Sequence, residues 1–115
     1  MLLYDPDGAR YRIDGTRMDL AREYRDALRG PFSPELQKVL DRMRTTPMKG
    51  RYALRVVVPF REWALCRLSG ERGVPPRDVP GARYRSMAEA EWDIFKRRWR
   101  DLTGHEVNVE DPDLG

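Results

Sequence analysis

The sequence has one cysteine, Cys66, and one histidine, His105, among its 115 residues. An internal disulfide is therefore excluded, and a zinc site of cysteine and histidine ligands cannot be built from this chain alone. We predict no metal and no cofactor bound by this chain. Because nothing in the sequence calls for an oxidising compartment, we expect a cytoplasmic protein.

Long apolar runs are also missing. None approaches the roughly 18 residues that a membrane span requires, and the start, MLLYDPDG, has neither the basic lead nor the apolar segment of a signal peptide. We therefore expect a protein that is neither inserted in a membrane nor exported by a conventional signal. Hydrophobic residues make up 40% of the chain and charged residues 36%, which fits one small folded domain.

Lysine is scarce, since only three of the 22 basic residues are lysines. The base composition of a genome explains this bias, but arginine forks also suit carboxylate pairs at a protein interface. The 22 basic residues are nearly balanced by 19 acidic ones, giving a formal charge of +3. This balance argues little for a nucleic-acid partner.

A catalytic set is missing as well. Cys66 has Arg61 and Arg67 nearby, and cationic neighbours lower a thiol pKa. A nucleophile nevertheless needs a positioned base, and the only histidine lies some forty residues away in the tail. Glu89 and Asp93 would share one helix face with Arg97, as expected of a solvated surface. We predict no catalytic residue in this chain.

One segment, FKRRWRD, has basic residues interleaved with aromatic ones, a pattern typical of proteins that bind single-stranded nucleic acid. Phe95 and Trp99 also belong, with Trp92, to an apolar stripe at helical spacing. We therefore expect these aromatic side chains to point into the core, and we consider a nucleic-acid partner disfavoured.

The spacing of apolar residues predicts an α+β fold that is mainly α-helical, with about four helices and a small β-sheet or hairpin. A hairpin is expected around residues 5–8, and a strand over Arg51 to Val58, where Tyr52, Leu54, Val56 and Val58 alternate. Helices are expected over residues 16–30 with Thr16 as N-cap, 33–44 with Ser33 as N-cap, 60–68, and 86–104 with Ser86 as N-cap; residues 74–86 are expected to form the main loop. Residues 1–104 would form a single domain, and the acidic tail 105–115 would be flexible or lie on a partner.

In order, SPELQKVLDRMRTTP, GRYALRVVVPFREWALCRL and GARYRSMAEAEWDIFKRRW resemble the small (alpha) subunit of N,N-dimethylformamidase, over roughly Ser33 to Leu102. The resemblance implies an accessory polypeptide of a hetero-oligomer, bound to a much larger catalytic subunit. In that family, a mononuclear iron held by tyrosines and a glutamate, and the amide hydrolysis itself, belong to the larger subunit. The small subunit carries no catalytic residue that could be transferred to this chain.

A docking surface is predicted on the strand 51–58 and the segment after it, where aromatic area and arginine forks occur together. It consists of Arg51, Tyr52, Arg61, Glu62, Trp63 and Arg67. Two other functions are weighed against the accessory subunit: a stand-alone binding or regulatory module, which could bind nucleic acid, and an independent enzyme. The balanced charge disfavours the first, and the missing catalytic set disfavours the second.

Overall fold

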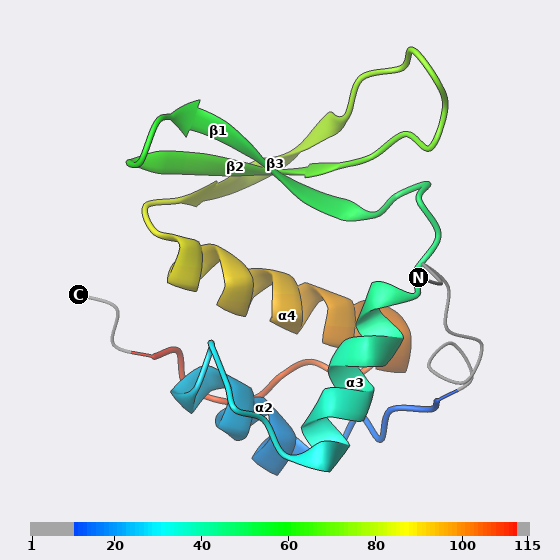
Figure 1. Cartoon of the computed structure of the whole chain (residues 1–115), viewed down its shortest axis with the longest axis vertical. Helices are drawn as coiled ribbons and strands as arrows, with labels where there is room; N and C mark the ends of the chain where they lie inside the picture. Colours follow the sequence, from blue (N-terminus) through cyan, green and yellow to red (C-terminus); the bar gives the residue numbers. More distant parts are fainter. Residues whose placement is uncertain (1–10, 113–115) are drawn as a thin grey trace. The chain divides into compact units, whose positions relative to one another are not determined.

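The computed structural model of the chain describes residues 11–112, so most of the predicted N-terminal hairpin lies outside the described part (Figure 1). The described residues fall into two compact units, one of residues 11–46 and 95–112 and the other of residues 47–94. The last helix, α4 (Met87–Thr103), begins in the second unit and ends in the first. No helix within residues 11–112 is both long and apolar enough to cross a membrane.

The first unit is helical and contains α2 (Met18–Asp26), α3 (Pro34–Arg44) and the second half of α4. The Ser33 hydroxyl accepts a hydrogen bond from the backbone N–H of Leu36 at 3.2 Å, and Pro34 occupies the first helical turn. The predicted cap of α3 is therefore confirmed. Thr16 does not cap α2, because the N-cap position is occupied by Arg17 without a side-chain hydrogen bond.

A carboxylate of α2 holds the start of α3. Both the N–H and the hydroxyl of Ser33 donate to the two carboxylate oxygens of Glu23, each at 2.6 Å. Arg17 adds an ion pair to Glu35 at 2.8 Å. Because hydrogen bonds to a carboxylate are stronger than neutral ones, these contacts fix the short connection between the two helices.

The apolar stripes of these helices supply the buried residues of the unit: Leu20, Ala21, Leu36, Val39, Met43, Phe95 and Trp99. The ring centroids of Tyr24 and Phe95 lie 4.2 Å apart, and those of Phe95 and Trp99 lie 5.6 Å apart. The expectation that Phe95 and Trp99 point inward is confirmed. The indole N–H of Trp99 also donates to the backbone carbonyl of Gly15 at 3.2 Å.

The described part of the acidic tail contacts this unit. Lys96 pairs with Asp111 at 2.9 Å, and Arg25 donates to the backbone carbonyl of Glu110 at 3.3 Å. The start of the tail is set by Gly104, whose φ of +76° ends α4 as a glycine C-cap does. Residues 105–112 have no regular secondary structure but are held at these points.

The second unit is built on an antiparallel sheet of three strands in the order β1 (Tyr52–Val58), β2 (Glu62–Arg67), β3 (Arg77–Tyr84), with β2 in the middle (Figure 1). The strand predicted over 51–58 is confirmed as β1. Its alternating residues share a face with their partners on β2, since Tyr52 is opposite Arg67, Leu54 opposite Leu65, and Val56 opposite Trp63.

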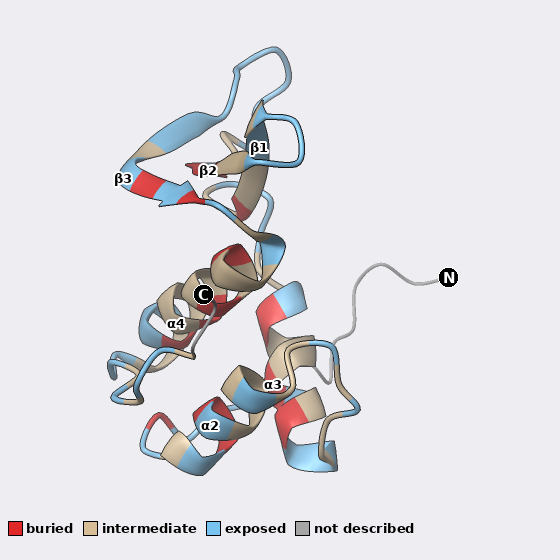
Figure 2. Cartoon of the chain, turned by 90° about the vertical axis from the view of Figure 1, so that its left-hand side faces the viewer, coloured by how far each residue is buried: buried red, intermediate tan, exposed pale blue. Residues whose placement is uncertain are grey.

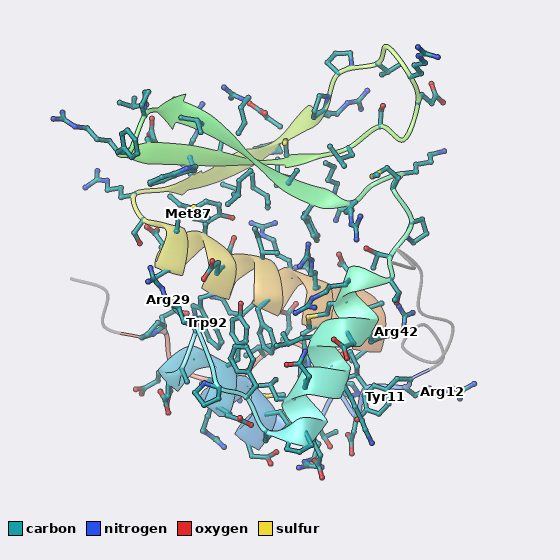
Figure 3. The ribbon with its side chains drawn as sticks, viewed as in Figure 1. Tyr11, Arg12, Arg29, Arg42, Met87 and Trp92 are labelled. Atoms are coloured by element: carbon teal, nitrogen blue, oxygen red, sulfur yellow. The ribbon has the colours of Figure 1, made fainter. Side chains whose placement is uncertain are left out.

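One face of the sheet carries the core of this unit. Its buried residues are Tyr52, Leu65, Ala82, Tyr84 and Ala90, with Leu54, Trp63, Val79 and Ile94 packed against them. Ala90 and Ile94 come from the first half of α4. Figure 2 shows the buried residues on β2 and β3 and the exposed connections at the strand ends. Met87, 41% exposed, and Trp92, 3% exposed, lie on successive turns of the same helix (Figure 3).

The prediction of a mainly α-helical fold with about four helices is wrong. Residues 11–112 contain three helices and a sheet of three strands, so the fold is α+β without a helical majority. The helix expected over residues 60–68 is strand β2. A short apolar segment fits both the 3.6-residue period of a helix and the two-residue period of a strand. This segment is a strand because it pairs with β1 on one side and with β3 on the other.

The other error concerns residues 74–86, predicted to be a loop. Strand β3 lies within them, although it contains Pro80 and Gly81. Ala64 is opposite Arg83 and Cys66 is opposite Asp78. Between these two pairs, β2 has one residue, Leu65, and β3 has four, residues 79–82. This wide bulge, where Gly81 has a φ of +76°, accommodates the proline on an edge strand.

Candidate functional site

The residues that could carry chemistry are dispersed in the structure. Within residues 11–112, no three histidine, cysteine, aspartate or glutamate side chains lie together as a metal site would require. His105 is exposed beside the end of α4.

Cys66 is buried in the middle of β2, on the face of the sheet opposite the core cluster. Its thiol donates to the carbonyl of Ala53 at 3.4 Å. Arg55 and Asp78, from the strands on either side of β2, form a two-point ion pair with N–O distances of 3.3 and 2.6 Å. The hydrogen bond from Arg55 lowers the pKa of Asp78, whereas burial raises the pKa of the Cys66 thiol.

We therefore expect Cys66 to react slowly with thiol reagents in the folded protein. At pH 8, alkylation by iodoacetamide should be at least about tenfold slower than in the same chain unfolded in urea, because burial and a raised pKa both lower the concentration of accessible thiolate. The rate of adduct formation, followed by mass spectrometry, tests this. Equal rates in the folded and unfolded chain would show an accessible, reactive thiol.

The acidic cluster on α4 is engaged in local structure. Tyr84 donates a hydrogen bond to Asp93, and Glu89 accepts one from the backbone N–H of Arg85 at 2.9 Å. The N–H of Glu89 in turn donates to the predicted cap residue, Ser86, at 3.1 Å. These contacts connect the end of β3 to the start of α4 and satisfy the free hydrogen-bonding groups of the first helical turn.

The six residues of the predicted docking surface fall at the two ends of the β1–β2 hairpin. Arg51, Tyr52 and Arg67 lie at its open end, and Arg61, Glu62 and Trp63 lie at its turn. Tyr52 and Trp63 are four register positions apart, or about 13 Å at 3.3 Å per residue. The structure thus brings the six together as two groups of three.

At the open end, Arg67 is held within the hairpin. Its guanidinium carbon lies 4.2 Å from the centre of the Tyr52 ring, and it donates hydrogen bonds to the Tyr52 hydroxyl and to the backbone carbonyl of Gly50. Tyr52 is 8% exposed. This end closes the sheet and leaves little aromatic area for a partner.

The turn end has a different character. Phe60 is 94% exposed, Val56 54% and Val58 41%. Of the six large hydrophobic residues that are exposed within residues 11–112, these three lie within five positions of one another. The predicted surface omitted them, although the run VVVPF, which continues an apolar strand across a proline, was a signal for an exposed apolar turn.

The sheet region is also markedly basic. Residues 47–86 contain nine lysines and arginines and three acidic residues, so their formal charge is +6 against +3 for the whole chain. Near the turn, Glu62 pairs with Arg83 at 3.6 Å. Arg61 is exposed, and no described residue pairs with it. The balanced charge of the whole chain conceals this local excess.

Comparison with known proteins bears on what such a surface serves. No curated protein matches the chain. A family profile, that of the N,N-dimethylformamidase alpha subunit, matches residues 10–110 and so includes both compact units. The resemblance predicted from the helix at Ser33, the strand at Tyr52 and the last helix is thereby confirmed: this chain belongs to the N,N-dimethylformamidase alpha subunit family.

Proposed function

We propose that the chain is a non-catalytic small subunit that binds and supports a larger, iron-dependent amide hydrolase subunit. The observation that carries the proposal is the match of residues 10–110 to the alpha subunit family. The dispersed carboxylates and the buried Cys66 agree with a supporting role, since neither is arranged for acid, base or nucleophilic catalysis. The iron and the hydrolysis are assigned to the larger subunit, and the complex to the cytoplasm.

A second candidate is a stand-alone module that binds nucleic acid, and the +6 charge of residues 47–86 favours it. Aromatic stacking is the other requirement for binding single strands. Phe95 and Trp99, the aromatic residues of the basic segment on α4, are 2% and 0% exposed and offer no stacking surface. The accessory subunit is therefore the stronger proposal.

We expect the chain purified alone to show no hydrolysis of N,N-dimethylformamide and no stoichiometric iron. Co-expressed with a dimethylformamidase large subunit from the same genome, it should co-purify as a hetero-oligomer that hydrolyses the amide. Amine release and elemental analysis, made on both preparations, test this. Turnover or stoichiometric iron in the washed chain alone would contradict the proposal, and so would failure to associate with the large subunit.

A further inference from the structure

The turn of the β1–β2 hairpin exposes a group of apolar side chains. We define the hairpin end as Val56, Val58, Phe60 and Arg61. Phe60 has the highest exposure of the large hydrophobic residues described, at 94%. A single exposed apolar residue is ordinary, but three grouped at the tip of one hairpin indicate a contact site.

Phe60 is also held in an unfavourable backbone conformation. Its φ is +63°, and among residues 11–112 it alone has a positive φ without being a glycine. The N–H of Arg61 donates to the carbonyl of Val58 at 3.0 Å, which with Pro59 defines a type II turn. Glycine or asparagine is favoured at the position of Phe60. A bulky residue at this position is exposed to solvent and adopts a backbone conformation that it disfavours, so it does not stabilise the fold. Such a residue indicates a functional role, such as contact with a partner.

The apolar side chains lie on both sides of the hairpin. Val56 is opposite Trp63 and shares its face, whereas Val58 is opposite Glu62. The extra residue between the two pairs shifts the register, so Val58 lies on the other face. Phe60 occupies the tip between them. A flat surface could cover only one of the two valines, whereas a pocket that admits the tip would cover both valines and Phe60.

The charge around the tip indicates which partner would provide that pocket. Arg61 follows Phe60 directly, and its guanidinium has no ion-pair partner among the described residues. It lies in a region whose net charge is +6. An acidic rim would complement it, because opposite charges at an interface rim steer association. The free edge of β1 contains no proline, whereas Pro80 and the wide bulge blunt the free edge of β3. Within the sheet, β1 is thus the edge strand better suited to pairing with a partner.

We propose that the hairpin end is the anchor of this subunit, with Phe60 inserted into an apolar pocket of the large catalytic subunit and Arg61 against carboxylates on the pocket rim. This inference rests on the proposed accessory role and adds to it the residue that carries the contact. It places the main contact at the turn, whereas Tyr52 and Arg67, at the open end of the hairpin, serve the sheet itself.

The test is Phe60→Gly, measured against the separately purified large subunit by biolayer interferometry. Glycine suits a positive φ, so the urea unfolding midpoint should be unchanged or slightly raised, while affinity should fall about thirtyfold or more, as for other aromatic anchors. Val74→Ser is the matched control, since Val74 is 48% exposed in the β2–β3 loop; its affinity should equal that of wild type. Arg61→Glu should weaken binding most at low salt.

The outcomes separate the inference from the proposed function. Wild-type affinity in Phe60→Gly, with normal binding by the parent chain, would overturn the anchor and leave the accessory role standing. No binding of the large subunit by the wild-type chain would overturn both. Retention of the wild-type chain on single-stranded DNA, with a steep salt dependence and loss in Phe60→Gly, would identify a nucleic-acid site. A wild-type dimer that Phe60→Gly dissociates would identify a second copy of the chain as the occupant. Either of these last two results would overturn the proposal.

Discussion

Replacing Trp99 with alanine should lower the free energy of unfolding by about 3–5 kcal/mol. Trp99 is fully buried and packs against Phe95, and its indole N–H satisfies the carbonyl of Gly15. Truncating a buried tryptophan to alanine costs about 3–5 kcal/mol. A small domain has a total free energy of unfolding of only about 5–15 kcal/mol, so this one change removes much of the stability.

Urea unfolding followed by far-UV circular dichroism measures the effect, and two variants isolate its origin. Trp99→Phe keeps a ring but leaves the Gly15 carbonyl without its donor, for which we expect a loss of about 1–3 kcal/mol. Met87→Ala, on an exposed position of the same helix, should change the free energy of unfolding by less than about 0.5 kcal/mol. A Trp99→Ala protein with a wild-type midpoint would show that the aromatic core is not what holds this unit.

Local signals predicted the elements that form by local rules. The cap at Ser33, the proline after it and the apolar stripe predicted α3, and the stripe containing Trp92, Phe95 and Trp99 predicted α4. The backbone hydrogen bonds of a helix join residues four positions apart, so residues close in sequence determine whether these two helices form. The alternation of Tyr52, Leu54, Val56 and Val58 predicted β1 equally well, because a period of two and β-branched residues are typical of strands.

The two missed strands depend on contacts that are distant in sequence. In β2, glutamate, alanine, leucine and arginine all favour helix, and only its position between two strands imposes an extended conformation. In β3, proline and glycine typical of a loop are tolerated because the strand lies at an edge and contains a bulge. Neither the central position of β2 nor the edge position of β3 can be read from residue type.

The same limitation applied to the candidate interface. With a helix expected over residues 60–68, Phe60 was not recognised as a turn residue and was left out of the predicted docking surface. In the structure Phe60 occupies the second central position of a turn and is exposed, while Trp63 lies against the core cluster. Arg61 lay within the predicted surface for its charge. Which of these side chains remains available to a partner depends on where the strand turns.

Next to the open end of the β1–β2 hairpin, two backbone segments approach each other closely. At Gly70, which has a φ of +74°, an added Cβ would lie 2.8 Å from the Cα of Lys49. The N–H of Gly50 donates to the carbonyl of Leu68 at 2.7 Å just beside this contact, so the two segments cannot separate without breaking the ladder. We expect Gly70→Ala to lower the free energy of unfolding by about 2–4 kcal/mol, from backbone strain and displacement of the Lys49 segment together.

Gly73→Ala separates these two causes. Gly73 has a φ of +81°, but an added Cβ there would meet no atom within 4 Å. Its alanine variant should therefore show the backbone cost alone, about 1–2 kcal/mol, partly offset because alanine restricts the unfolded chain. Urea unfolding of the two variants beside wild type gives the difference. A larger loss in Gly70→Ala measures the steric term at the hairpin base, whereas equal losses would mean that the Lys49 segment moves aside freely and that the open end of the hairpin is not rigid.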